Sequence, residues 1–172
     1  EIISECIECG DYDSQCVRET IAALASEGDW RELWVLANKM EREVSILFDN
    51  DNRIYVDIGQ QGEVRLAPPV GATIPFKLWV HTHPQDAYWS ITDRETLAAY
   101  SGILQEALVL GHDHLKHTEH TGSPDVPTLG VGMLGNWTSE STLFFAQAET
   151  HTVRGREIGG RMNEANSRQN TN

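Results

Sequence analysis

An apolar run that ends in two histidines constrains the fold of this chain more than any other feature. Residues 76–80 read Phe-Lys-Leu-Trp-Val and predict a strand that delivers His81 at its end. Alternate side chains of a strand point the same way, so His81 and His83 can present their rings together, about 7 Å apart along the backbone. Pro84 then ends the strand. Two imidazoles on one side of a strand end can bind a metal.

A helix predicted after this strand brings an acidic side chain to the same place. Residues 92–104 have a helical pattern, and Thr92 and Glu95 form a capping pair at its start. Asp93 would then occupy the first helical position, from which its carboxylate can face the strand end. Two histidine nitrogens and one carboxylate oxygen are the ligand set of a catalytic zinc, which keeps its fourth position for water. The predicted ligands of Zn²⁺ are His81, His83 and Asp93.

Hydrolysis at such a zinc requires two further groups. One is a base that takes a proton from the attacking water, and the other is a donor to the oxyanion that forms on the substrate. Ser90 is well placed for the donor role. The best candidate for the base is Glu43, at the head of a predicted strand over 44–48. Glu41 is its nearest competitor, and the spacing alone does not separate the two.

Together these motifs resemble the JAMM motif of the JAB/MPN zinc metallopeptidases, a family that includes proteasome-lid deubiquitinases and their prokaryotic relatives. The likeness rests on His81-x-His83-Pro84, on Ser90-x-x-Asp93 and on an upstream Glu-Val pair that opens an apolar strand. It covers about residues 30–150, within which the predicted order of elements agrees with the family.

The resemblance implies an MPN-like fold and an isopeptidase or peptidase activity. By this resemblance His81, His83 and Asp93 would bind Zn²⁺. Ser90 would stabilise the oxyanion, and Glu43 would be the general acid and base, because family members place a Glu-Val pair there. The implied substrate is a protein, for example a conjugate of a ubiquitin-like modifier. The alternative is a non-catalytic MPN-like module that binds partners, although such members typically lose the ligand residues that this chain keeps.

Two helices are predicted ahead of the motif. Residues 16–25 carry apolar side chains at helical spacing, and the pattern stops near Gly28. Asp29 can cap a second helix, with Glu32 three residues later. That helix has an apolar stripe, interpreted as core, which consists of Trp30, Leu33, Trp34 and Ala37.

Strands are predicted on both sides of the motif. Apolar residues at 44–48, a turn at 49–52 and an alternating segment at 54–58 predict a hairpin. Strands mixed with helices in this order indicate an α/β or α+β fold, with a mixed sheet sandwiched by helices. The other predicted segments are a short strand at 63–67, a buried strand at 107–111, a long polar loop at 112–127, and strands at 128–134 and 142–153.

The length of 172 residues fits one domain with a core of its own. We expect a cysteine-containing segment with a short helix at 1–28, a JAB/MPN-like domain at 29–153 and a disordered tail at 154–172. The net charge of −13 argues against nucleic acid as a partner. A helix that spans a bilayer needs about 18 apolar residues, and no apolar run approaches that length. No signal peptide is visible either, so we expect a cytoplasmic protein without membrane contact.

The cysteines lie close together near the start of the sequence, at Cys6, Cys9 and Cys16. They are interpreted as reduced thiols or a single disulfide, with a structural metal site as the less favoured alternative. A zinc deaminase would need His-x-Glu followed by a distant Pro-Cys-x-x-Cys. Since every cysteine precedes residue 17, that class is set aside.

A second group of histidines lies within the predicted polar loop. It is either a second metal site or a solvated polar segment, and we favour the solvated segment. Its members are His112, His114, His117 and His120. Between the predicted zinc ligands, Asp86, Tyr88 and Trp89 can line a substrate groove, although Trp89 can equally belong to the core.

Overall fold

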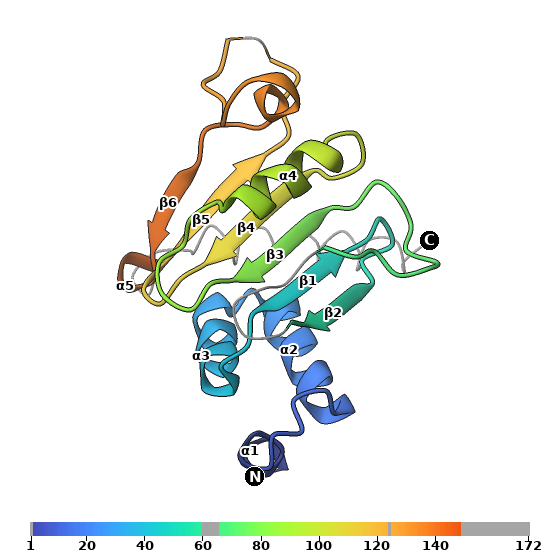
Figure 1. Cartoon of the computed structure of the whole chain (residues 1–172), viewed down its shortest axis with the longest axis vertical. Helices are drawn as coiled ribbons and strands as arrows, with labels where there is room; N and C mark the ends of the chain where they lie inside the picture. Colours follow the sequence, from blue (N-terminus) through green and yellow to red (C-terminus); the bar gives the residue numbers. More distant parts are fainter. Residues whose placement is uncertain (1, 60–65, 124, 149–172) are drawn as a thin grey trace, which may run out of the picture.

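A six-stranded mixed sheet lies at the centre of the protein (Figure 1). The computed structural model of the chain describes residues 2–59, 66–123 and 125–148. The strands are β1 (Val44–Phe48), β2 (Ile54–Ile58), β3 (Leu78–Thr82), β4 (Glu106–Leu110), β5 (His114–Glu119) and β6 (Ser141–Phe144). Their order across the sheet is β2-β1-β3-β4-β5-β6, with β3 and β4 parallel and the other neighbours antiparallel.

Helices cover both faces of this sheet. They are α1 (Ile2–Glu8), α2 (Gln15–Glu27), α3 (Trp30–Met40), α4 (Ile91–Ala99), the 3₁₀ helix η1 (Gly132–Asn136) and α5 (Phe145–Ala148). Alternate residues of a strand point to opposite faces. Val44, Ile46 and Phe48 therefore pack with α2 and α3, whereas Leu47 packs with α4 and η1 on the other face. The predicted mixed α/β architecture is confirmed.

The two helices predicted ahead of the motif are confirmed as α2 and α3. The Ser14 hydroxyl caps α2 by accepting a hydrogen bond from the Val17 N–H. Gly28 ends α2 in the left-handed conformation, with φ of 69°, which glycine adopts without a Cβ clash. Side chains of α2 share one apolar core with α3 and the sheet, so part of the segment 1–28 packs directly on the residues that follow it.

The predicted hairpin is confirmed as β1 and β2, and a buried carboxylate fixes its turn. Asp49 Oδ1 accepts hydrogen bonds from the backbone N–H groups of Asp51 and Arg53. Asp49 Oδ2 accepts a third from the N–H of Thr73 in the segment that leads to β3. Burial alone would raise the pKa of the Asp49 carboxyl, but these bonds outweigh it and the pKa lies below its usual value.

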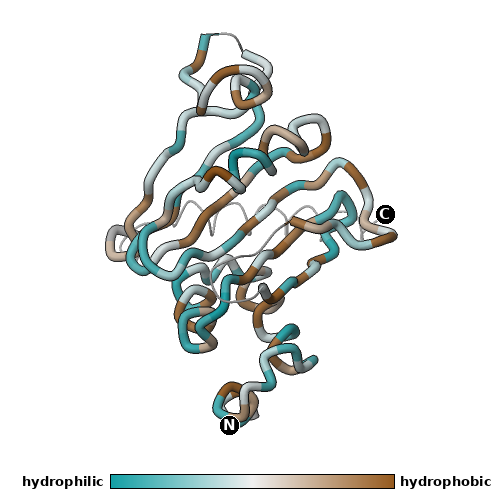
Figure 2. The backbone as a smooth tube through the Cα atoms, viewed as in Figure 1, coloured by the Kyte–Doolittle hydropathy of each residue, from teal (hydrophilic) through white to brown (hydrophobic). Residues whose placement is uncertain are grey.

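The prediction of an irregular loop at 112–127 is wrong, because β5 occupies its first half. β5 is an inner strand, paired with β4 on one side and β6 on the other. Its polar composition hides an alternation in which Leu115 and His117 are buried on one face. The ring of His117 is accommodated there because its Nε2 lies 3.1 Å from Glu106 Oε2 on β4. Figure 2 shows β5 as more hydrophilic than β4.

Three further predicted segments differ from the structure. The strand expected at 128–134 is wrong, because Thr128 makes only an isolated bridge to Thr138 and η1 follows. The strand expected at 142–153 ends at Phe144, where α5 begins, and residues 149–153 lie outside the described residues. Residues 63–65 of the strand expected at 63–67 lie outside the described residues. Residues 66 and 67 belong to no strand. The tail 154–172 is also outside the described residues.

Across the described ranges, no helix combines the length and apolar character that crossing a membrane requires.

Candidate metal centre

The end of β3 and the first turn of α4 bring two imidazoles and one carboxylate together. His81 Nε2 lies 3.1 Å from Asp93 Oδ1, and His83 Nε2 lies 3.2 Å from Asp93 Oδ2. The two imidazole centroids are 5.2 Å apart. Relative exposures of 1% for His81, 6% for His83 and 4% for Asp93 place the whole group in the interior. The three residues predicted as ligands are therefore neighbours in space.

The start of α4 explains how Asp93 reaches the strand end. Ser90, and not Thr92, is the N-cap, and its hydroxyl accepts a hydrogen bond from the Asp93 N–H at 3.1 Å. In return Asp93 Oδ2 accepts a 2.8 Å bond from the Ser90 N–H, which completes a capping box. The expected helix 92–104 is thus shifted to Ile91–Ala99, and Asp93 occupies its third position instead of its first.

A stacked tryptophan supports the ring of His81. Trp79 lies two residues earlier on β3, so both side chains are on the α4 face of the sheet. Their ring centroids are 4.3 Å apart with an interplanar angle of 15°. The indole N–H of Trp79 donates to Ser45 Oγ on β1 at 2.9 Å, which fixes the indole in turn.

The backbone and ring of His83 are held from three directions. Its N–H donates to the Leu110 carbonyl at 2.9 Å, so it continues the pairing of β3 with β4. Its carbonyl accepts a 2.7 Å bond from the indole N–H of Trp34 on α3. Tyr88 packs edge-on against its imidazole, with centroids 4.5 Å apart. These contacts restrain a residue that lies just beyond the regular strand.

Burial and mutual contact set the charges of the three groups. Burial lowers the pKa of the His81 imidazole, and the neighbouring Asp93 carboxylate offsets only part of that effect, so the ring is neutral at neutral pH. Burial alone would raise the pKa of the Asp93 carboxyl. Contacts with His81 and His83, together with the bond from Ser90, outweigh it, and the pKa lies far below its usual range. A neutral imidazole and an ionised carboxylate are the forms that bind metals.

The geometry of the group could hold a metal ion, because one ligand atom from each of His81, His83 and Asp93 lies within 4.8 Å of the other two. Both ring nitrogens of His81 are buried without a hydrogen-bond partner among the described residues, although Asp93 Oδ1 is close to Nε2. A buried imidazole without partners is costly unless something else binds it. Zinc bonds of roughly 2.0–2.1 Å in a tetrahedral site separate neighbouring ligand atoms by about 3.3 Å. The two nitrogen to oxygen distances, 3.1 Å to Asp93 Oδ1 and 3.2 Å to Asp93 Oδ2, are near that value, so the three residues are close enough together to hold a metal ion.

Glu43 lies near His83, because both residues line one pocket. The ladder between β1 and β3 ends at the pair Ser45–His81, and Glu43 lies two residues before Ser45, in the segment that leads into β1. The N–H of Val44 on β1 donates to the hydroxyl of Thr82 on β3 at 2.9 Å, and this bond joins the two strands there. Glu43 is partly buried.

A pocket of about 230 Å³ is lined by both Glu43 and His83. Its walls come from the middle and C-terminal part of α3, the segment before β1 and the end of β3. They include Trp34, Glu41, Glu43, Thr82 and His83. Glu41 therefore lines the same pocket as Glu43, but it is exposed, whereas Glu43 is partly buried.

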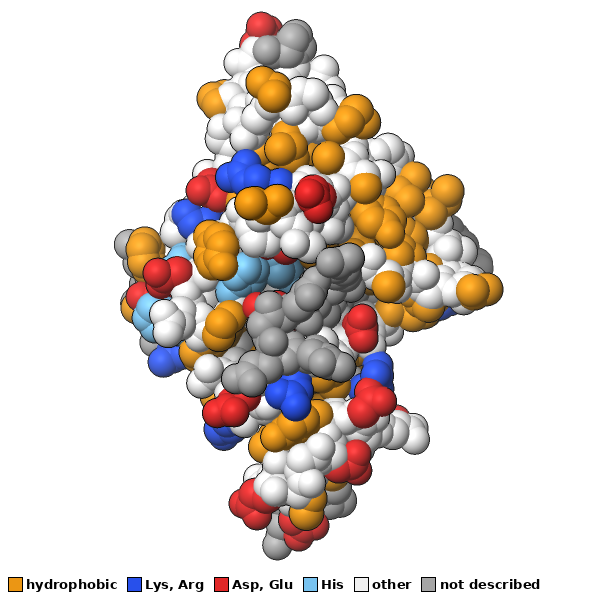
Figure 3. Space-filling model, in the orientation of Figure 1, with side chains coloured by type: hydrophobic (Ala, Val, Ile, Leu, Met, Phe, Trp, Pro, Cys, Tyr) orange, Lys and Arg blue, Asp and Glu red, His pale blue; other side chains and the backbone are white. Residues whose placement is uncertain are grey.

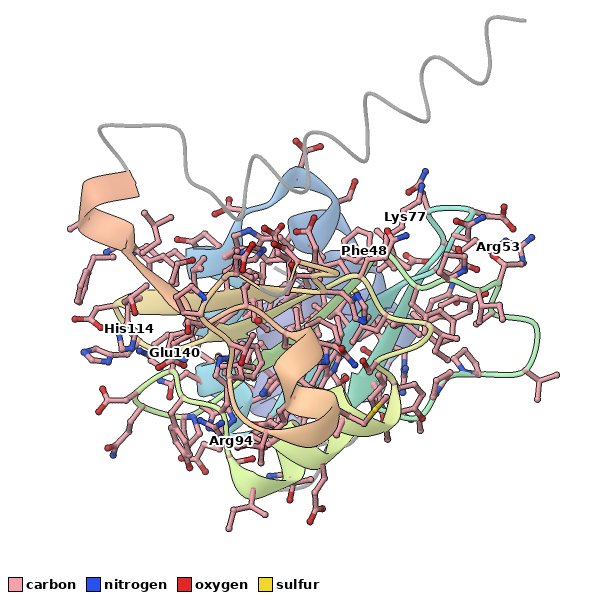
Figure 4. The ribbon with its side chains drawn as sticks, turned by 90° about the horizontal axis from the view of Figure 1, so that it is seen from above. Phe48, Arg53, Lys77, Arg94, His114 and Glu140 are labelled. Carbon is pink, nitrogen blue, oxygen red and sulfur yellow. The ribbon has the colours of Figure 1, made fainter. Side chains whose placement is uncertain are left out.

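The four histidines of the second group do not form one site. His112 and His114 lie near Asp86, and His117 pairs with Glu106. His120 instead faces the hydroxyl of Ser101 at 3.2 Å. Figure 4 shows His114 at the end of the sheet opposite Arg53 and Lys77, and Figure 3 shows histidine atoms at more than one place on the α4 face. The nitrogens of His114 contact the Ala87 N–H and the Asp113 carboxylate.

The remaining candidates separate into core and surface. Trp89 is buried, as the core interpretation expects, whereas Tyr88 is half exposed beside His83. The thiols of Cys6, Cys9 and Cys16 are free, and among the described residues none belongs to a group with metal-binding geometry.

The residues that sequence reasoning missed are those that support the ligands through other elements. The interpretation of Trp34 as a core residue is incomplete, because Trp34 is only partly buried and its indole N–H donates to the His83 carbonyl. Its periodicity is that of a core residue, so the sequence contains no signal for this role. The contact of Trp79 with His81 could be predicted from the sequence, because residues two apart on one strand point to the same face.

Comparison of the chain with protein-family models, with curated proteins and with solved structures found no match.

Proposed function

We propose that this protein is a zinc-dependent peptidase or isopeptidase of the JAMM type, with an MPN-like fold. The observation that carries the proposal is the convergence of His81, His83 and Asp93 in the interior, beside a pocket that Glu43 lines. Two histidines and one carboxylate are the ligand set of many hydrolytic zinc sites, which leave one coordination position open.

In this proposal His81, His83 and Asp93 hold the zinc. When bound there, zinc supplies Lewis-acid polarisation of the substrate carbonyl and lowers the pKa of water. Glu43 takes a proton from the attacking water and later delivers it to the nitrogen of the leaving amine. The Ser90 hydroxyl donates a hydrogen bond to the carbonyl oxygen as negative charge develops on it. Water attack and proton transfer then release a carboxylate and an amine.

Zinc content is the first test of the proposal. Purified protein should contain close to one zinc per chain, and Asp93→Ala should lose it, since a tetrahedral site needs all three protein ligands. The measurement is elemental analysis after exhaustive dialysis. Cys9→Ser is the control, because that exposed thiol lies directly after α1 and outside the site. A wild-type chain without metal after zinc-supplemented folding would refute the proposal.

The role of Glu43 is tested by a matched pair of variants. Glu43→Gln should keep the zinc and reduce kcat by about 10²–10⁴-fold, which is the usual contribution of a general acid and base. Glu41→Gln changes the neighbouring carboxylate of the same pocket and should leave kcat within about twofold. The opposite outcome would assign the base to Glu41 and contradict the role given to Glu43.

The substrate class is tested with conjugates and linear fusions of ubiquitin-like modifiers, incubated with and without a chelator. Cleavage that a chelator abolishes and added zinc restores is the expected result. A zinc-loaded protein that cleaves none of these substrates, but binds one of them, would favour the non-catalytic MPN-like module.

A further inference from the structure

Trp34 connects the metal-binding strand to a helix that is distant in sequence. Its indole N–H donates a 2.7 Å hydrogen bond to the carbonyl of His83, 49 residues further along the chain. The indole is partly buried near the middle of α3, and its ring also lies edge-on to His112 with centroids 6.2 Å apart. Trp30, one turn earlier on the same helix, is fully buried in the core, and its indole N–H has no partner among the described residues.

The bond from Trp34 lies just beyond the paired part of β1 and β3. The regular pairing of β3 with β1 stops at His81. One residue later the Thr82 hydroxyl accepts from the Val44 N–H, and after that the His83 carbonyl accepts from Trp34. On the opposite side the His83 N–H still donates to Leu110 of β4. Pro84 follows and has no N–H with which to continue a ladder.

The same indole also lines the pocket beside the candidate base. The pocket of about 230 Å³ contains the Trp34 ring, Glu43 and His83 in its walls. One side chain thus contacts the backbone of a ligand through its N–H and borders the space next to Glu43 through its ring. A residue that contacts neither metal nor reacting atoms directly can still fix a ligand, as outer partners of metal-binding histidines do.

We propose that Trp34 is a positioning residue that holds His83 in the orientation for metal binding. The proposal rests on the proposed zinc site and deepens it. Trp34→Phe removes the N–H donor and keeps a ring in the pocket. It should weaken zinc binding by about 10-fold, at the lower end of the 10–100-fold range for outer partners of ligands. Activity in excess zinc should return to near the wild-type kcat, because the ligands themselves are intact.

The matched control is Trp30→Phe, the same chemical change on the same helix. It deletes an N–H that has no partner among the described residues, so zinc affinity should stay within about twofold of wild type. Zinc affinity is measured for the full-length wild type and both variants by competition with a chromophoric chelator, together with thermal unfolding of the metal-free proteins. Trp30→Phe shrinks a buried ring and lowers the unfolding temperature by itself. A general loss of stability would therefore weaken zinc binding in Trp30→Phe as well, whereas a positioning role weakens it in Trp34→Phe alone.

Three outcomes are decisive. Weaker zinc binding in Trp34→Phe alone, with kcat rescued by excess zinc, supports the positioning role. Equal zinc affinity in all three proteins refutes it while leaving the proposed hydrolase intact. A wild-type chain that binds no zinc refutes both, because there is then no ligand for Trp34 to position.

Discussion

Substitutions at Ser90 separate the two roles that its hydroxyl can have. As the N-cap of α4, Ser90 Oγ accepts a 3.1 Å hydrogen bond from the Asp93 N–H. In the proposed reaction the same hydroxyl donates its proton to the substrate oxyanion. Ser90 has φ of −66° and ψ of 171°, an extended conformation that alanine and glycine both adopt without strain. Ser90→Ala and Ser90→Gly therefore remove one hydroxyl at the same backbone position.

The two substitutions should differ in stability but agree in activity. Replacing an N-cap serine by alanine costs about 1 kcal/mol, whereas glycine costs only a few tenths of a kcal/mol. For a chain of 172 residues, about 1 kcal/mol lowers Tm by roughly 2–4 °C. Loss of one oxyanion donor reduces kcat by about 10²–10³-fold, and this loss should be the same in both variants.

Thermal unfolding, zinc content and kcat on one cleavable conjugate are measured for both variants and the wild type. Zinc content is required because Asp93 lies in the capped turn, and a displaced ligand would also lower kcat. If Ser90→Gly retains zinc and the wild-type kcat, the oxyanion role is wrong and the hydroxyl serves only the helix. If the Tm of Ser90→Ala equals that of the wild type, the reasoning about the cap is wrong.

Two further predictions concern stability. A methyl group on Gly111 would lie 2.5 Å from the backbone nitrogen of Ala87, in the segment between His83 and Asp93. Gly111→Ala should therefore lower the free energy of unfolding in urea by about 1–3 kcal/mol. Gly102→Ala, which places its methyl group in open space, should cost much less, and equal costs would contradict the packing argument. Asp49→Asn should cost about 1.5–3 kcal/mol at pH 7, because a buried charged acceptor is lost. The Asp49 pKa is lowered on folding, so its contribution is complete above the unfolded pKa of about 3.9 and disappears as pH falls through the folded value. The difference between Asp49→Asn and wild type in chemical unfolding should therefore shrink at acidic pH, and a constant difference would refute this origin.

Local sequence patterns identified the segments whose burial follows a simple period. The apolar runs of β1, β3 and β4 and the helical spacing in α2 and α3 predicted those elements to within a few residues. β5 was not predicted, because its buried His117 is accommodated by a contact with Glu106 that the polarity of the sequence does not indicate. Thr128–Leu134 has an apolar content typical of a strand, but glycines interrupt it, and Gly132 has φ of 62°, outside the extended region.

The sequence by itself determined that two histidines stand at a strand end and that an acid follows in the next helix. Their meeting follows from a short connection and from the alternation of side chains, which are local properties. The tertiary structure decided which residue caps α4, that Glu43 and His83 line one pocket, and that Trp34 bonds to the His83 carbonyl. Each of these depends on strand register or on the packing of a helix against the sheet. Such contacts join residues far apart in the chain, and a pattern read along the chain does not encode them.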